Sequence, residues 1–290
     1  MKIYIFILPF LLSCALFAQE NTDENRPVEY PAFYQAELNT TYCQVDDWSG
    51  KLDLYRPKNS GEPTPLIIDI HGGGWIHGVK ESHRDFDVFF KMNWAVANVE
   101  YRLAEDAPAP AAIEDVRCAL IYLIENAGKL NINPKKIVVM GNSSGGHLAL
   151  MTGLLGNNHA FDKNCAGIDS ISVFAIIDKY GHADLRRPEK LGTKSVLKWV
   201  KGKAMNPSFM SSISPITYVN KNNPPVFIVH GDADQFVPYA QSEALAEELE
   251  KNGVHHQFIT IKGGAHGNFN PEELNQINEK IIAFLKELGI

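Results

Sequence analysis

The segment Gly141–His147 constrains the fold of this chain most, because it places a serine between glycines directly after an apolar run. It reads G-x-S-x-G with Ser143 at its centre, follows Ile137–Met140 and leads into Leu148–Met151, which is typical of the start of a helix. A tight turn between a strand and a helix strains the serine backbone and exposes its hydroxyl. Glycines are needed there because the backbones approach closely. The pattern predicts a strand–turn–helix unit that presents Ser143 as a nucleophile.

A glycine-rich turn upstream offers what such a nucleophile needs to stabilise an oxyanion. The apolar run Leu66–Ile70 is typical of a buried strand, and it ends at His71–Trp75, which reads His-Gly-Gly-Gly-Trp. Glycines leave backbone N–H groups free to face a pocket, where preorganised donors stabilise developing negative charge. In this motif the hole is completed by the amide after the nucleophile. We therefore expect the amides of Gly73, Gly74 and Ser144 to form an oxyanion hole.

Two downstream loops offer an acid and a base. Asp232 and Asp234 follow the apolar run Pro225–Val229, and either can orient a histidine, or serve as a turn residue or helix cap. We favour Asp234 as the acid and assign Asp232 a structural role. His266 lies in a small-residue loop after the last strand-like run, where it can act as general base. Ser143, Asp234 and His266 are thus the candidate catalytic residues.

Strand-like and helix-like segments alternate along the chain, which predicts a single domain of the α/β class. We expect strands at 52–57, 66–70, 94–99, 137–140, 171–177, 226–229 and 257–261, with helices near 85–92, 113–124, 240–252 and 277–285. Such alternation gives a mostly parallel sheet flanked by helices. Its active groups gather at the carboxyl ends of the strands. The catalytic domain is expected over residues 41–290.

The N-terminus has the pattern of a targeting segment. Lys2 precedes an almost wholly apolar run at residues 3–17, which is short for a membrane span and ends at the small residue Ala18. We expect a signal peptide over residues 1–18 and a loose leader over 19–40, and hence a secreted or periplasmic protein. An alternative is a lipoprotein signal, in which Cys14 carries the lipid.

Composition and cysteine usage exclude several classes of function. The net charge is −7, and no dense cluster of basic residues appears, which argues against nucleic-acid binding. The chain contains no C-x-x-C or H-E-x-x-H motif, so we expect no metal or other cofactor. Cys43, Cys118 and Cys165 remain after export, which permits one disulfide without naming the pair. Cys118 lies in a predicted helix and is expected to act as a small buried apolar residue.

The interval 182–214 interrupts the alternation and is rich in lysine and arginine. An insertion between late strands can form a lid or specificity loop, or it can be a solvated surface helix. Both alternatives stay open from the sequence. Trp75, His182 and Trp199 are the candidate substrate contacts, the last of them if the insertion overhangs the site.

The motifs together resemble a known family. Hormone-sensitive-lipase-type α/β-hydrolases share the patterns at His71–Trp75, Tyr101–Ala104, Ile113–Val116 and Gly145–Ala149. The bacterial feruloyl esterase-like branch, BD-FAE, is more similar still, in Ser214–Val219, His230–Asp234, Val237–Pro238 and Gln241–Ser242. The resemblance covers roughly residues 40 to 288 and implies an α/β-hydrolase fold with the same three catalytic residues. One departure is Tyr180–Leu185, where the family has a Gly-Pro-Thr-Asp-Leu-like turn, near the expected pocket rim.

The resemblance implies a secreted serine carboxylesterase that acts through an acyl-enzyme. Its expected substrates are short-chain or carbohydrate-linked esters, acetyl or feruloyl, on a small molecule or a polysaccharide. Alternatives are an arylformamidase, a peptidase related to prolyl oligopeptidase, and a non-catalytic binding module with this fold. The sequence does not decide the acyl chain length or the oligomeric state.

Overall fold

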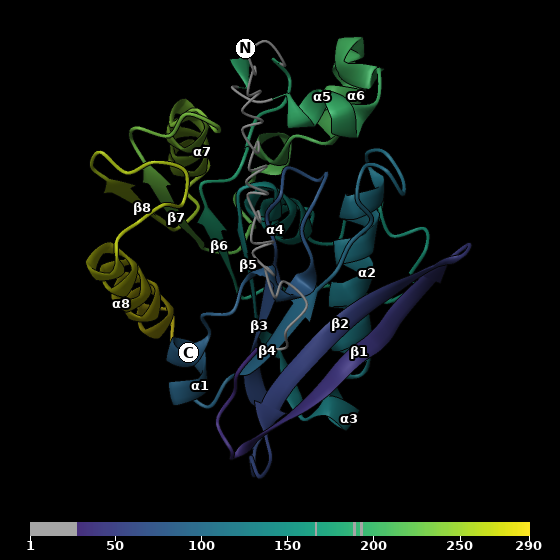
Figure 1. Ribbon diagram of the computed structural model, residues 1–290, viewed down its shortest axis with the longest axis vertical. Coiled ribbons are helices and arrows are strands. Elements are labelled where there is room, and N and C mark those ends of the chain that lie inside the picture. The colour runs from purple at the N-terminus through teal and green to yellow at the C-terminus, as the bar shows by residue number, and fades with distance from the viewer. Residues whose placement is uncertain (1–27, 166, 188–189, 192–193) are drawn as a thin grey trace, which may run out of the picture.

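The computed structural model describes residues 28–165, 167–187, 190–191 and 194–290 (Figure 1). The predicted signal peptide and the candidate lipid attachment site at Cys14 lie outside these residues. Within the described part of the chain, no helix is long and apolar enough to cross a membrane.

The prediction of a loose leader over residues 19–40 is wrong in its last part. Strand β1 (Tyr34–Val45) already begins at Tyr34, and it pairs antiparallel with β2 (Trp48–Pro57). The Tyr34 ring is buried, and its hydroxyl donates a hydrogen bond to the carbonyl of Trp94 at 2.8 Å. Polar residues on the exposed face of this edge strand explain why the sequence resembles a leader.

One sheet of eight strands forms the centre of the molecule, in the order β1-β2-β4-β3-β5-β6-β7-β8. The remaining strands are β3 (Thr64–Ile70), β4 (Ala95–Val99), β5 (Ile132–Asn142), β6 (Ala175–Lys179), β7 (Val226–Gly231) and β8 (His256–Ile261). The β1–β2 and β2–β4 pairs are antiparallel, and all other pairs are parallel. The expected mostly parallel sheet is confirmed, although β6 begins at Ala175 rather than at residue 171.

Helices cover both faces of this sheet (Figure 1). They are α1 (Asp87–Lys91), α2 (Ala111–Glu125), α3 (Ala127–Leu130), α4 (Ser144–Leu154), α5 (Ser195–Val200), α6 (Pro207–Ser212), α7 (Ala240–Lys251) and α8 (Pro271–Glu287). Short 3-10 turns are Lys80–Ser82, Lys203–Met205 and Pro215–Tyr218.

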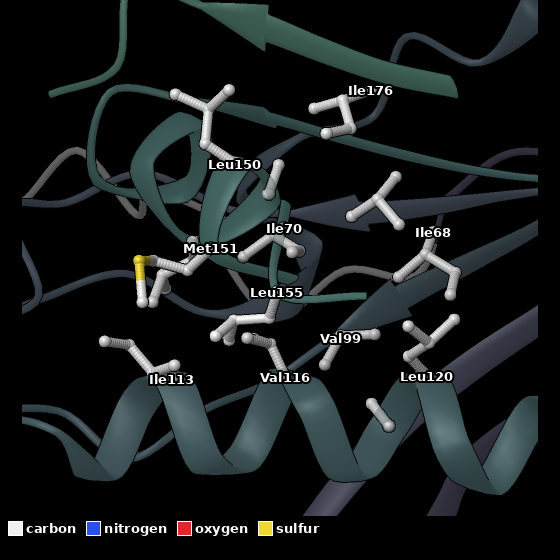
Figure 2. Packing of buried hydrophobic residues seen from close by; sticks show 14 of the residues in the cluster. Ile68, Ile70, Val99, Ile113, Val116, Leu120, Leu150, Met151, Leu155 and Ile176 are labelled. Carbon is white, nitrogen blue, oxygen red and sulfur yellow. The ribbon is translucent and has the colours of Figure 1, made fainter. Parts of the chain in front are cut away.

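Alternate residues of each central strand enter two separate cores. In β3, Ile68 and Ile70 pack with α2 and α4, whereas Ile67 packs with α1 and α8. Figure 2 shows the first core, in which Val116 and Leu120 of α2 face the sheet. Both strand faces are buried, so these strands read as continuous apolar runs, and this is why the sequence located them well.

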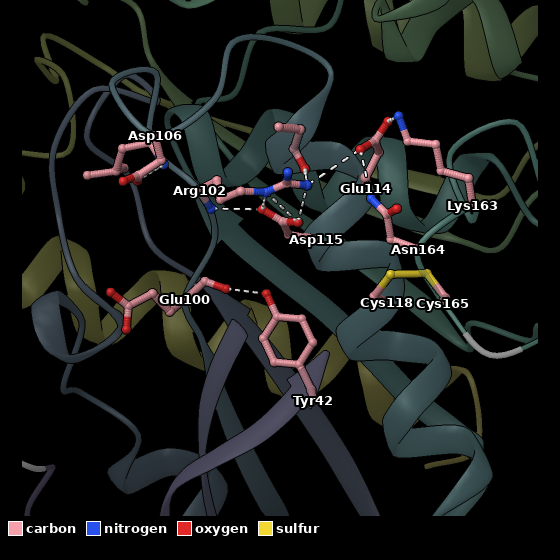
Figure 3. A network of polar contacts seen from close by, with 12 residues as sticks. Tyr42, Glu100, Arg102, Asp106, Glu114, Asp115, Cys118, Lys163, Asn164 and Cys165 are labelled. Carbon is pink, nitrogen blue, oxygen red and sulfur yellow. Dashed lines mark hydrogen bonds and ion pairs between the residues drawn. A yellow bond between two sulfur atoms is a disulfide. The ribbon is translucent and has the colours of Figure 1, made fainter. Parts of the chain in front are cut away.

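The first turns of α2 hold two loops beside the sheet (Figure 3). Asp115 accepts hydrogen bonds from the Arg102 guanidinium, the shortest at 2.7 Å, and one from the Arg102 amide at 2.8 Å. Glu114 forms an ion pair with Lys163 at 2.7 Å and accepts a hydrogen bond from Asn164. The Arg102–Asp115 pair is largely buried, so it fixes the position of the segment after β4. This segment lies beside the oxyanion loop.

A disulfide joins Cys118 of α2 to Cys165, across 47 residues of sequence. The expectation that Cys118 is only a small apolar residue is therefore wrong, because the loop after α4 brings Cys165 against the helix. Cys43 is a half-buried free thiol.

Replacing Cys118 and Cys165 together with alanine is expected to lower the free energy of unfolding by about 2–4 kcal/mol, because the cross-link restricts the unfolded chain. Urea unfolding of the double variant measures this, with Cys43→Ala as the matched control. Equal urea midpoints for wild type and double variant would contradict a stabilising bridge.

Candidate active site

Ser143 occupies a strained turn between β5 and α4. Its backbone has φ 56° and ψ −119°, a conformation that side-chain-bearing residues rarely adopt. A Cβ at Gly145 would lie 2.0 Å from the carbonyl oxygen of Ile70, and one at Gly141 would lie 2.2 Å from that of Gly145. Glycine is therefore required on both sides, since any side chain would push α4 away from the sheet. The Ser143 amide donates to the carbonyl of Lys179 at 2.9 Å, which holds the turn in place.

The three candidate catalytic side chains form one chain of hydrogen bonds. His266 Nε2 lies 2.8 Å from Ser143 Oγ, and its Nδ1 lies 2.6 Å from Asp234 Oδ2. Nδ1 therefore carries the proton shared with the carboxylate, and Nε2 is left to accept the serine proton. The residues come from the ends of β5, β7 and β8, which the parallel sheet brings to one edge.

Asp234 is fixed by three further contacts. Its Oδ1 accepts hydrogen bonds from the amides of Phe236 and Val237 at 2.8 and 2.9 Å. Its Oδ2 also lies 3.1 Å from His230 Nε2. Burial raises the pKa of Asp234, but the hydrogen bonds from His230, His266 and the two amides outweigh it and hold that pKa well below its usual value. The carboxylate therefore stays ionised and keeps His266 in the useful tautomer.

The competing acid, Asp232, has a different partner. Its Oδ1 accepts a hydrogen bond from the Gly263 amide at 2.6 Å, which ties the β7 loop to the β8 loop. The structure brings Asp234, and not Asp232, to His266. The sequence did not lead us to expect a contact between His230 and Asp234. The spacing of four residues between them was a signal that could have indicated it.

The expected oxyanion residues surround Ser143. Gly73 and Gly74 have φ of 116° and 60°, so the loop after β3 turns back on itself above the nucleophile. Both line the same cleft as Ser143. A Cβ at Gly73 would lie 1.9 Å from the carbonyl oxygen of His77, so this loop also requires glycine. Ser144 is the first residue of α4, where the amide has no partner within the helix.

A cleft of about 530 Å³ opens above Ser143. Trp75 and His182 lie in its wall but are buried, so their contact with substrate stays a prediction. Burial lowers the pKa of His182 to about 4, so its imidazole is neutral. The Tyr180–Leu185 segment was expected near the pocket rim, but neither Tyr180 nor Phe236 was assigned a contact. Their rings flank that of His266, with centroids at 4.9 and 5.4 Å. The Phe236 ring is 60% exposed, which makes it a rim residue available to substrate.

The expectation that Trp199 contacts substrate is wrong. Its ring in α5 is fully buried and stacks on Trp75, with centroids 4.5 Å apart and an interplanar angle of 6°. Trp75 has a φ of 60°, which a side chain adopts only when its surroundings hold it there. Helix α5 thus packs through Trp199 against Trp75 of the oxyanion loop, while Ser195 reaches the cleft.

Trp199→Ala is expected to lower kcat about 10- to 100-fold with a smaller change in KM, because Trp75 and the adjacent Gly74 lose their support. The free energy of unfolding should also fall by about 3–5 kcal/mol. Steady-state kinetics below the melting temperature separates the two effects. Leu197→Ala on the exposed face of α5 is the matched control. A folded Trp199→Ala protein with wild-type kcat would show that the stack does not position the loop.

A buried carboxylate lies directly behind the serine turn. Asp178 in β6 accepts a hydrogen bond from the Gly181 amide at 2.9 Å, and its other oxygen has no partner among the described residues. Burial raises the pKa of Asp178 to about 7, although His230 and the Gly181 amide oppose the shift. Between about pH 4 and 7 the folded protein therefore binds more protons than the unfolded chain, so stability falls as pH rises through this window.

Asp178→Asn should remove that dependence. The variant is expected to gain stability over wild type at pH 8.5 but not at pH 4, by up to about 4 kcal/mol for a shift of roughly three units. Urea unfolding at both pH values tests this, and a difference that does not change with pH would contradict the raised pKa.

Comparison with known proteins points to one family. Residues 52–249 match the family model described as BD-FAE. The chain is 27% identical to "Esterase LipC" of Mycobacterium tuberculosis over 266 residues, covering 84% of this chain and 66% of LipC. It therefore spans about two thirds of that relative's length.

Two solved structures share the architecture. A "truncated form of carbohydrate esterase from gut microbiota" superposes with a TM-score of 0.78 at 27% identity, covering 90% of this chain and 99% of that one. An "acetyl ester-xyloside bifunctional hydrolase" from Caldicellulosiruptor lactoaceticus superposes with a TM-score of 0.74 at 25% identity, covering 84% and 90%.

Proposed function

Since this chain belongs to the BD-FAE family and has the α/β-hydrolase fold, we propose that it is a carboxylic ester hydrolase with Ser143, His266 and Asp234 as its catalytic triad. The observation that carries the proposal is the continuous hydrogen-bonded path from Ser143 Oγ through His266 to Asp234, open to a cleft. A nucleophile, a base and an orienting acid in this geometry are what acyl transfer requires.

The proposed reaction has two halves. His266 Nε2 takes the proton of Ser143 as its Oγ attacks the ester carbonyl, and Asp234 stabilises the resulting imidazolium. The amides of Gly73, Gly74 and Ser144 donate to the oxyanion. His266 then protonates the leaving alcohol, and an acyl-serine remains. Water, deprotonated by the same imidazole, hydrolyses the acyl-serine and regenerates the enzyme.

We further propose that the physiological substrate is a short acyl ester, acetyl or feruloyl, carried by a carbohydrate. Two structurally similar enzymes are a carbohydrate esterase and an acetyl ester-xyloside hydrolase, which favours this class. Export of the chain, by a signal peptide over residues 1–18 or as a lipoprotein through Cys14, fits a polymeric substrate outside the cell. The Cys118–Cys165 bridge is consistent with such an oxidising compartment.

Rates on p-nitrophenyl acetate, p-nitrophenyl octanoate, methyl ferulate and acetylated xylan test the proposal. Hydrolysis of the acetate and of xylan would support a carbohydrate acetyl esterase, whereas preference for ferulate or octanoate would indicate a feruloyl esterase or a lipase. Labelling of Ser143 by a fluorophosphonate without ester turnover would favour an amide or peptide substrate. If the protein shows neither labelling nor turnover, that result would favour a non-catalytic binding module.

A further inference from the structure

A second cavity, of about 490 Å³, adjoins the cleft above Ser143. The two share walls at Gly73, His77, Asn142, Tyr180 and Gly267, so a molecule in one touches the residues around the other. The second cavity extends toward α8, and none of the proposed catalytic side chains lines it. An ester has two halves that diverge from its carbonyl, and these two adjoining spaces can receive one half each.

Polar groups without partners line this second cavity. Lys179 lies at the end of β6, and among the described residues no hydrogen bond or ion pair reaches its ammonium group. The same holds, within the described part of the chain, for the side chains of Asp85 and Asn278. By contrast, the neighbouring His83 is paired with Asp69 at 2.9 Å.

Lys179 is half-buried, and its ammonium group has no partner among the described residues, so its N–H donors are free for water or a ligand. Burial lowers the pKa of Lys179, while the charges of Asp69 and Asp85 oppose that shift. Such an arrangement fits a site in which bound water or a ligand completes the coordination of the ammonium group.

The charges around this cavity favour a neutral ligand. The positive charge of Lys179 faces the two negative charges of Asp69 and Asp85, so an anionic ligand is not favoured. Burial lowers the pKa of His71 to about 4, so that imidazole adds no charge. Hydroxyl groups match this lining, because they can donate to the Asp85 carboxylate and accept from the Lys179 ammonium.

The rest of the lining suits the faces of a sugar ring. Phe269, Leu274 and Ile277 add apolar surface to the cavity, against which the C–H face of a pyranose can pack. Asp85 and Asn278 also line a neighbouring groove of about 650 Å³ between α1 and α8. The groove and the cavity together form a continuous surface on which an oligosaccharide can bind, leading away from Ser143.

We propose that this cavity is a glycosyl subsite, in which Lys179, Asp85 and Asn278 bind the hydroxyl groups of a neutral sugar that carries the ester. The glycan chain continues along the groove between α1 and α8. This inference rests on the proposed esterase function, and it deepens that function by naming how the alcohol half of the substrate is held.

Lys179→Met and Asn278→Ala test the subsite. The readout is kcat/KM on acetylated xylotriose and acetylated cellotriose, each divided by kcat/KM on p-nitrophenyl acetate, whose leaving group offers no sugar hydroxyls. Lys179→Met should lower this ratio about 10- to 100-fold, as expected for a lost hydrogen bond to a charged group, and Asn278→Ala about 3- to 10-fold. Lys280→Met is the matched control, because Lys280 is exposed on α8 and lines neither space.

Binding provides a readout that does not depend on turnover. Calorimetric titration of the Ser143→Ala protein with deacetylated xylohexaose should show binding that Lys179→Met weakens by a similar factor. Unchanged ratios and unchanged binding in both variants would overturn the subsite while leaving the esterase intact. Tighter binding of a uronic-acid-bearing xylo-oligosaccharide than of the neutral one would overturn the neutral assignment. Absence of any Ser143-dependent hydrolysis would instead refute the proposed function itself.

Discussion

Replacing Ser143 with alanine is expected to lower kcat by about a million-fold, because the variant has no atom to attack the carbonyl. The fold should persist, since among the described residues the Ser143 side chain bonds only to His266, and it faces the cleft. Residual turnover from the oxyanion amides and binding alone is about 10³- to 10⁴-fold above water. Stopped assays on p-nitrophenyl acetate at high enzyme concentration measure this loss.

Ser172→Ala is the matched control for Ser143→Ala. Ser172 is an exposed serine in the loop before β6 and lines no part of the cleft. It should keep wild-type rates, and circular dichroism should show the same melting temperature for all three proteins within about 1–2 °C. A well-folded Ser143→Ala protein that hydrolyses the ester within tenfold of wild type would refute the proposed nucleophile.

The serine turn and the order of the triad were predictable because their signals are local. Each of Ser143, Asp234 and His266 directly follows an apolar strand, and parallel strands bring such ends to one edge. Gly141 and Gly145 could be read as obligatory because a close approach of backbones leaves no room for a Cβ. These features depend on a few neighbouring residues and the rule that strands pair in parallel.

The features that escaped prediction depend on contacts between distant residues. Trp199 was expected to reach substrate, but it stacks on Trp75, 124 positions earlier in the chain. Cys118 meets Cys165 only because the loop after α4 returns to α2. Lys179 looks like an ordinary strand-end lysine. Only once the surrounding elements are placed is it visible that no described residue pairs with its ammonium group. No periodicity or motif in the sequence specifies such pairings.

Asp234→Asn is expected to lower kcat about 10⁴-fold through the tautomer of His266. The Oδ1 position accepts the amides of Phe236 and Val237, so the asparagine oxygen must occupy it and the NH₂ group must face the histidines. His266 Nδ1 then accepts a hydrogen bond, its proton moves to Nε2, and it can no longer take the proton of Ser143. KM should change little, because Asp234 does not line the cleft.

The same substitution should also disturb His230. Its Nε2 contacts both Asp234 Oδ2 and the carbonyl of Val237 at 3.1 Å, so it carries a proton and would face the new NH₂ group. Two donors pointing at each other destabilise the loop, and a lower melting temperature should accompany the loss of activity. Asp232→Asn is the matched control, because its oxygen can still accept the Gly263 amide and it has no contact with His266. If Asp232→Asn loses activity as severely as Asp234→Asn does, the orienting role cannot belong to Asp234 alone, whereas a loss confined to Asp234→Asn would locate it there.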